Sequence, residues 1–182
     1  AASFKRPNLY VSMWHNQFFQ SELHIIRFME REKYSVSYVT NIDIHLHGER
    51  ILKQHKIWIS MGHDEYWSLE MRNHIQAAQE AGLNLVWLSG NNAYWNVRFE
   101  PSSDGDPVGR MICYKEAGLD PVEVGNTSNL LPTIKWRDLG RPEAAIQGTQ
   151  LDMSQWGIYT GMSTYVSKQA PAWILKDTGL KA

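Results

Sequence analysis

The chain has 182 residues, a length that suits one domain with a sizeable core. Its 18 Lys and Arg residues nearly balance 19 Asp and Glu residues, and the formal net charge of -1 excludes a global basic field that would hold nucleic acid or an anionic membrane. No apolar run approaches the roughly 18 residues that a membrane-spanning helix needs. We therefore expect a soluble protein whose function depends on a local site.

The chain starts with Ala-Ala-Ser-Phe, without an initiator methionine or a targeting segment. We expect residues 1–182 to form a single α/β domain that is part of a longer chain. The one cysteine, Cys113, cannot form an internal disulfide, and the sequence has no Cys-x-x-Cys pair, which favours a reducing, cytoplasmic location. Bulky neighbours on both sides of Cys113 indicate a buried, inert thiol.

The first predicted element is a helix over 21–32, because apolar residues recur there at helical spacing and Ser21 is available as an N-cap. Residues 34–40 are rich in Val, Tyr and Thr and are predicted to form a strand that ends at a turn over 41–43. A short helix is expected at 48–54.

A compact apolar run at 56–60 predicts a buried strand. The pattern then becomes helical from Ser68, which can cap a helix, to Gly82, which can end it in left-handed geometry. Residues 84–88 are the next predicted strand. This alternation predicts a parallel sheet with right-handed crossovers and helices on its faces.

Two loops, 61–67 and 89–96, follow predicted strands. Ligands of parallel sheets bind beyond the carboxyl ends of the strands, so we expect both loops to face one crevice. After residue 100 turn residues recur, which predicts loop-rich insertions with a short strand at 110–115.

The densest group of reactive side chains is in the first loop, where His63, Asp64 and Glu65 precede the Ser68 helix. An imidazole beside two carboxylates suits general acid–base chemistry or a hard metal ion. The same acidic residues would also be favourable near a helix N-terminus, and His63 would then be a structural histidine. The residues alone leave both interpretations open.

The second loop contains Asn91, Tyr94, Trp95 and Arg98. A side-chain amide can polarise a carbonyl group as an oxyanion-hole donor does, while the aromatic and basic residues could bind substrate. The alternative, favoured on the residues alone, is that asparagine serves a left-handed turn and Trp95 packs in the core.

Two histidines, His45 and His47, would point the same way in an extended segment. Two aligned histidines could hold a metal ion, but the spacing indicates no third ligand, and a solvated pair is the favoured interpretation. The sequence has no Gly-x-Ser-x-Gly elbow and no phosphate-binding glycine loop, which argues against a serine nucleophile and a nucleotide site.

Several blocks of the sequence together form a longer and more specific pattern, which resembles the C-terminal domain of the large subunit of N,N-dimethylformamidase over about residues 3–148. The blocks are Ser3-Phe4-x-Arg6-Pro7, Tyr34–Asp43, Ser60–Ser68, Ser89–Arg98, Arg110–Lys115, and Trp136-Arg137-Asp138 with Arg141-Pro142-Glu143. The resemblance implies a three-layer α/β sandwich with a mostly parallel sheet, similar to the class I glutamine amidotransferase fold. It differs from glutamine amidotransferases in having Gly-His-Asp where those enzymes carry a cysteine nucleophile.

This resemblance also implies a mononuclear iron (Fe³⁺) site formed by two tyrosines and a glutamate. Glu65 matches the glutamate, and His63 and Asn91 match polar residues around the substrate and the attacking water. Glu143 is the candidate for a further glutamate that acts in proton transfer. Tyr10 is the candidate for one tyrosine ligand, and the other belongs to a segment before the Ser-Phe-x-Arg-Pro block, where this chain begins.

Two hypotheses follow for the function of the chain. In the first, it is an iron-dependent amidohydrolase that cleaves the C–N bond of a small amide, with His63, Asn91 and Glu65 at its site and with Tyr94, Trp95 and Arg98 binding substrate. The resemblance further implies a small subunit and a homo-oligomer as partners. In the second, the chain is a non-catalytic binding or structural module that keeps the scaffold and lacks a complete metal site.

Overall fold

The computed structural model describes residues 1–5, 18–122, 130–150, 173, 176–177 and 179. The chain divides into two compact units, Ala1–Leu151 and Asp152–Ala182, and every element discussed below belongs to the first. Most of the second unit is outside the described residues, so a single domain over 1–182 stays a prediction. No helix in the described ranges combines the length and the apolar character that crossing a bilayer requires.

The first helical segment is a π-helix, η1 (Phe18–Glu22), which runs directly into α1 (Leu23–Arg31). This confirms the helix predicted at 21–32. The N-cap position of α1 belongs to Glu22 rather than Ser21, and the Glu22 side chain makes no capping hydrogen bond. Because α1 continues an existing helical turn, it starts without the cap that the sequence suggested.

The strand predicted at 34–40 is absent, since these described residues have no regular secondary structure. Tyr34 and Tyr38 are 60% and 52% exposed, so their side chains do not pack on a sheet. The next element, α2 (Asn41–Leu52), begins seven residues earlier than expected. Thr40 and Asp43 explain its start with a capping box: Thr40 Oγ1 accepts from the Asp43 amide at 3.2 Å, and Asp43 Oδ2 accepts from the Thr40 amide at 2.8 Å.

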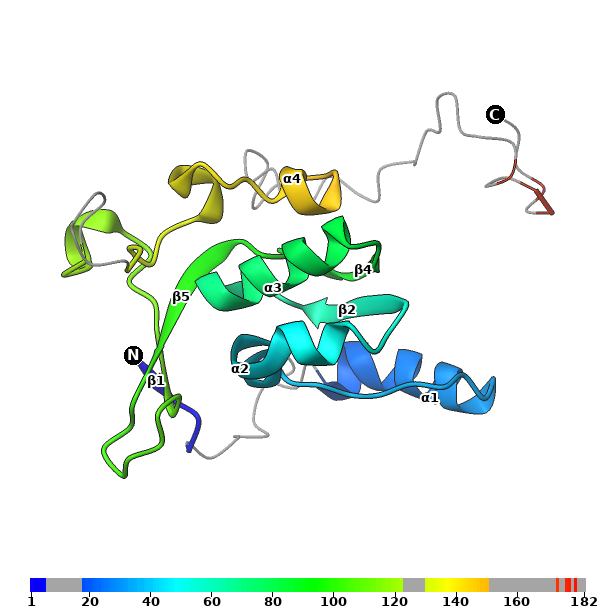
Figure 1. The fold of residues 1–182 in the computed structure, drawn as a ribbon, viewed down its shortest axis with the longest axis horizontal. Helices are drawn as coiled ribbons and strands as arrows, with labels where there is room; N and C mark the ends of the chain where they lie inside the picture. Colours follow the sequence, from blue (N-terminus) through cyan, green and yellow to red (C-terminus); the bar gives the residue numbers. More distant parts are fainter. Residues whose placement is uncertain (6–17, 123–129, 151–172, 174–175, 178, 180–182) are drawn as a thin grey trace. The chain divides into compact units, whose positions relative to one another are not determined.

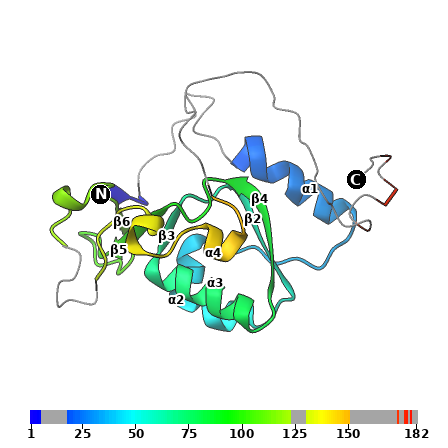
Figure 2. The same cartoon turned by 90° about the horizontal axis from the view of Figure 1, so that it is seen from above.

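The centre of the unit is a parallel strand pair, β2 (Ile57–His63) and β4 (Asn84–Gly90), joined through α3 (Leu69–Glu80). As predicted, Ser68 caps α3 by accepting a hydrogen bond from the Met71 amide at 3.2 Å, and Gly82 follows the helix with φ +102°. Figure 1 shows α2 and α3 side by side next to β2 and β4. In Figure 2, α1 is on the opposite side of this strand pair.

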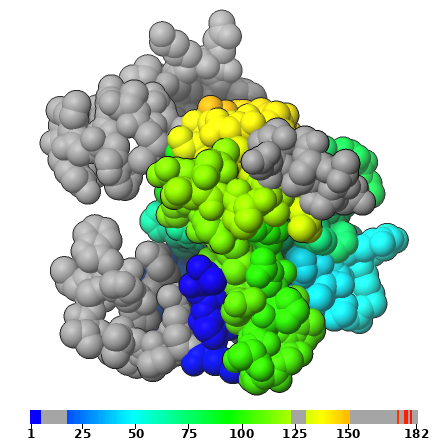
Figure 3. Space-filling view, turned by 90° about the vertical axis from the view of Figure 1, so that its left-hand side faces the viewer, coloured from blue at the N-terminus to red at the C-terminus, as the bar shows by residue number. Residues whose placement is uncertain are grey.

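A second sheet has four short strands in the order β1-β6-β5-β3. They are β1 (Ala2–Ser3), β6 (Arg110–Ile112), β5 (Trp95–Glu100) and β3 (Tyr66–Ser68). Only β3 and β5 pair in parallel; β5–β6 and β1–β6 are antiparallel. Figure 3 shows residues 1–5, in blue, against the green residues beside them.

A mixed α/β fold is therefore confirmed, but the strands form two sheets, and one of them is mixed rather than mostly parallel. The expected strand at 110–115 is present only at 110–112. Beyond it the described chain has only short helical pieces, η2 (Ala117–Leu119), η3 (Trp136–Leu139) and α4 (Ala144–Gln147), which fits the expected loop-rich region.

Tryptophans form much of the core, and Trp67 and Trp136 have no exposed surface. The rings of Trp58, Trp67 and Trp87 pack against each other with centroids 5.4 to 5.9 Å apart. Large rings bury more apolar area per residue than aliphatic side chains do. This packing places a rigid core directly behind the strand ends that carry the predicted site.

Candidate functional site

The two predicted site loops meet at one edge of the structure. In the β2–β4 pair His63 is opposite Gly90, so both strands end at the same level. Backbone hydrogen bonds then join the loops themselves: the Ala93 amide donates to the Asp64 carbonyl at 2.9 Å, and the Trp95 amide donates to the Glu65 carbonyl at 2.9 Å. The predicted convergence of loops 61–67 and 89–96 is confirmed.

Two glycines make room for side chains at this edge. The backbone of Gly62 is left-handed, with φ +73°, and a Cβ atom there would lie 3.1 Å from Glu22 Oε1. A Cβ atom on Gly90 would lie 3.2 Å from His63 Nε2. The Glu22 carboxyl group and the His63 ring therefore lie close to the backbone of the two strand ends.

Asp64 is the buried acid of the first loop, and both of its oxygens are hydrogen-bonded. Asn41 Nδ2 at the start of α2 donates to Oδ1 at 3.1 Å, and Ser60 Oγ donates to Oδ2 at 2.8 Å. Burial raises the pKa of Asp64, although the hydrogen bonds from Ser60 and Asn41 act in the opposite direction. Asp64 thus holds the first turn of α2 against the end of β2.

From Ser60 a chain of polar side chains crosses to the second loop. The hydroxyl oxygens of Ser60 and Ser89 are 2.6 Å apart, and Ser89 in turn donates to Asn92 Oδ1. Asn92 Nδ2 donates to Gln147 Oε1 at 2.9 Å and to the Ser89 carbonyl at 3.2 Å. This relay, Asp64–Ser60–Ser89–Asn92–Gln147, ties the loop that carries Glu65 to the loop that carries Asn91.

A cavity of about 210 Å³ lies beside these strand ends. Its polar wall is formed by Glu22, Asn41, Ser60, His63 and Asp64. Its other lining residues are apolar: Val39, Ile44, Trp58, Ile59, Met61, Trp67, Met71 and Ile75. A concave site with a few convergent polar groups on an apolar wall is typical of small-molecule binding.

Glu22 enters this cavity from η1. Burial raises the pKa of its carboxyl group, and the negative charge of Asp64 raises it further. Sequence reasoning did not place Glu22, Asn41 or Ser60 at the site. Glu22 and Asn41 each lie at the start of a helix, where an acidic or amide residue has an ordinary local role, so no spacing signal distinguished them.

Glu65 is partly buried beside Trp95, whose Nε1 donates to Glu65 Oε1 at 3.0 Å. A carboxylate has a second oxygen, which suits a metal ligand. Among the described residues, however, no three His, Cys, Asp or Glu side chains converge to hold a metal ion. Tyr66, the neighbouring tyrosine, accepts a hydrogen bond from Lys115 Nζ at 3.0 Å, and Tyr10 is outside the described residues. The described residues therefore fit an iron site only in part.

Asn91 has a left-handed backbone with φ +54°, the turn geometry that asparagine tolerates. This agrees with the structural interpretation of the loop and leaves its side chain partly accessible at the same edge as His63. The predicted roles of Asn91 and His63 stay predictions.

The three predicted substrate-binding residues lie in different surroundings. Tyr94 is buried, with the Arg137 guanidinium 5.1 Å from its ring centroid. Trp95 is partly buried, with Lys115 Nζ 5.1 Å from its ring centroid. Arg98 points away from these groups into an ion pair, described next.

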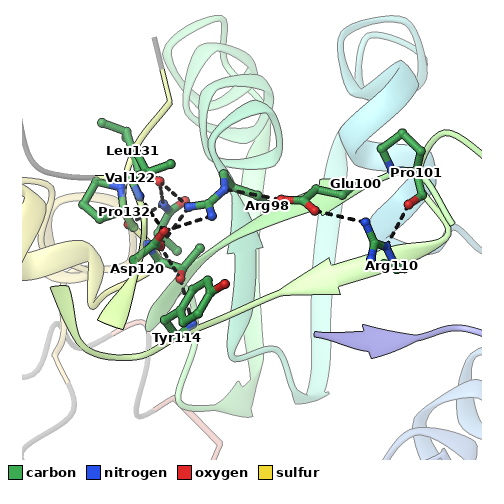
Figure 4. A network of polar contacts seen from close by, with 11 residues as sticks. Arg98, Glu100, Pro101, Arg110, Tyr114, Asp120, Val122, Leu131 and Pro132 are labelled. Carbon is green, nitrogen blue, oxygen red and sulfur yellow. Dashed lines mark hydrogen bonds and ion pairs between the residues drawn. The ribbon is translucent and has the colours of Figure 1, made fainter. Parts of the chain in front are cut away.

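Arg98 forms a two-pronged ion pair with buried Asp120, shown in Figure 4. Its Nη1 and Nη2 donate to Asp120 Oδ2 and Oδ1 at 2.8 and 3.0 Å, and Nη1 also donates to the Leu131 carbonyl at 3.1 Å. The amide and hydroxyl of Thr133 donate to Asp120 as well, at 2.6 and 2.7 Å. This geometry shows Arg98 fastening residues 120–133 to β5.

Glu143 is fully buried and is bound by Arg137, whose Nη2 donates to Glu143 Oε1 at 2.6 Å. It does not line the cavity beside His63. Its predicted part in proton transfer stays a prediction, but the structure gives this carboxylate a direct counter-ion.

The remaining candidates from the sequence have structural surroundings. His45 and His47 are on α2, so the extended segment assumed for them is wrong, and His45 Nδ1 lies 2.8 Å from Ser68 Oγ and 3.2 Å from Glu70 Oε2. Cys113 is partly buried, and burial raises the pKa of its thiol, which agrees with an unreactive cysteine.

Taken together, the fold and the site define an α/β protein with a small polar cavity at the carboxyl ends of a parallel strand pair, the place where such folds bind ligands. All 182 residues match the protein family described as N,N-dimethylformamidase beta subunit-like, C-terminal. The chain belongs to this family. A comparison with curated proteins finds no match.

Proposed function

We propose that the chain is the catalytic domain of an iron-dependent amidohydrolase of the N,N-dimethylformamidase type, which hydrolyses the C–N bond of a small amide. The observation that carries this proposal is the meeting of His63 and Glu65 with the Asn91 turn at one strand edge, in a chain that belongs to the family along its whole length. The family also supports a class I glutamine amidotransferase-like fold, a small subunit and a homo-oligomer as parts of the proposal.

Each side chain has a distinct task in this proposal. Glu65, with Tyr10, holds the iron, which supplies Lewis acidity when bound. His63 accepts a proton from the attacking water, and the Asn91 amide donates a hydrogen bond to the oxyanion that develops on the amide carbonyl. Tyr94 and Trp95 form a wall for the substrate. The Asp64 relay keeps these groups at a fixed separation.

The test compares the complete wild-type protein with Glu65→Ala and with Glu80→Ala, a matched control at the exposed end of α3. We expect iron in wild type and in Glu80→Ala, with hydrolysis of N,N-dimethylformamide by both. We expect Glu65→Ala to lose both iron and activity, measured by elemental analysis and by amine release. Undiminished iron in Glu65→Ala would remove Glu65 from the metal site.

A second function, a non-catalytic module, is favoured by the hydrogen bond from Trp95 to Glu65. In that case the glutamate serves to fix β5 beside the first loop. The complete wild-type protein would then contain no stoichiometric iron and release no amine, and Glu65→Ala would lower its melting temperature without changing metal content.

A further inference from the structure

The cavity beside His63 contains one carboxyl group that the fold itself does not use. Glu22 stands at the N-cap position of α1 but does not cap the helix, and its Oε1 lies against the left-handed turn at Gly62. Within the described residues no hydrogen bond or ion pair reaches this carboxyl group. A partly buried carboxylate without a cation is costly, as the raised pKa of Glu22 indicates.

The other acids near the site are already matched. Asp64 accepts from Asn41 and Ser60, and Glu143 is paired with Arg137. Glu65 accepts from Trp95. Glu22 is therefore the acid with capacity left for a ligand in the cavity.

The charge of the cavity wall selects the kind of ligand. Two carboxyl groups, Glu22 and Asp64, and one histidine, His63, are the titratable groups among the described lining residues, which include no lysine or arginine. A small anion, such as a carboxylate product, meets like charge here. A cation meets opposite charge, and Glu22 supplies the acceptor for its N–H groups.

The rest of the wall selects the shape of that cation. Apolar side chains from β2, α2 and α3, including Ile59, Ile44 and Met71, leave room for carbon atoms but offer no hydrogen bonds. The volume of about 210 Å³ is several times the ~30 Å³ that one water molecule takes up in the liquid. A small ammonium ion with short alkyl groups matches both walls.

We propose that this cavity is an amine subsite that binds a small alkylammonium ion, with the Glu22 carboxylate as its counter-ion and the apolar wall around its alkyl groups. Its meaning for catalysis rests on the proposed function: hydrolysis of an amide produces a carboxylate and an amine, and this subsite holds the amine. The substrate class is then amides of small alkylamines.

The binding test needs no catalytic activity. Dimethylammonium chloride is titrated into the complete protein near neutral pH by isothermal calorimetry, with sodium chloride at equal ionic strength as the blank. Three variants are compared with wild type: Glu22→Gln, Glu22→Asp, and Glu49→Gln as a control at an exposed acid on α2. Circular dichroism checks that each variant is folded.

We expect wild type and Glu49→Gln to bind dimethylammonium equally, Glu22→Gln to bind at least tenfold more weakly, and Glu22→Asp to lie between them. Equal affinity in wild type and Glu22→Gln overturns the role of Glu22. A wild-type protein that binds no dimethylammonium overturns the subsite. A protein that binds dimethylammonium through Glu22 but hydrolyses no amide supports the subsite and removes the proposed function, so the two failures are distinct.

Discussion

Asp120 and Glu22 are two acids that the fold treats in opposite ways. Burial acts to raise the pKa of Asp120, but the hydrogen bonds from Arg98 and Thr133 outweigh it and hold this pKa well below its usual range. Glu22 has burial and a neighbouring negative charge without a cation, and its pKa is raised. A matched carboxylate fastens the structure, whereas an unmatched one beside a cavity marks a place for a ligand.

The largest expected effect comes from breaking the matched side of this comparison. Asp120→Ala leaves the Arg98 guanidinium buried without its counter-ion and should destabilise the fold by about 3–5 kcal/mol. Urea unfolding followed by circular dichroism measures this change. Glu22→Gln, which removes an unmatched charge, should leave the free energy of unfolding nearly unchanged near neutral pH. Equal losses in the two variants would contradict the distinction.

A smaller effect is expected from the relay that joins the two site loops. Ser89→Ala removes the hydroxyl that contacts both Ser60 and Asn92 and leaves their polar groups without this partner, at a cost of about 1–3 kcal/mol. Ser89→Thr keeps the hydroxyl and should recover most of the loss. The melting temperatures of both variants provide the measurement, and a fully stable Ser89→Ala protein would show that the relay does not hold the loops.

The smallest effect is a difference in pH dependence. The folded-state pKa of Asp120 is lowered, so its contribution to stability is present above the unfolded value of 3.8 and is lost as the pH falls. The folded-state pKa of Glu22 is raised above its unfolded value of 4.5, so wild type should lose stability relative to Glu22→Gln as the pH rises from 4 to 7. Unfolding of both proteins at these pH values measures the difference. A constant gap would contradict the raised pKa.

The sequence was most informative where local signals agreed. For the core unit from β2 to β4, the apolar run at 56–60, the cap at Ser68 and the stop at Gly82 each predict the same boundaries, and the structure confirms them. The meeting of the two loops followed from parallel pairing alone.

The errors arose where tertiary packing decides the outcome. Residues 34–40 favour a strand by composition, yet no neighbouring strand pairs with them, and the Thr40–Asp43 capping box starts α2 instead. Glu22 reaches the cavity from a helix about 40 residues away in sequence from Asp64, a contact that no local pattern encodes. The partner of Arg98 was equally hidden, because Asp120 lies in a turn-rich segment without periodicity.

The tryptophan cluster behind the site has an optical consequence. Trp58 and Trp67 line the cavity, and both also pack against Trp87 with nearly perpendicular or tilted rings. Indole transition dipoles held this close and at fixed angles interact, so the cluster should give a distinct near-ultraviolet circular dichroism signal. A cation entering the cavity would change the field at two of the three rings, and the protein's own spectrum would then report occupancy without an added label.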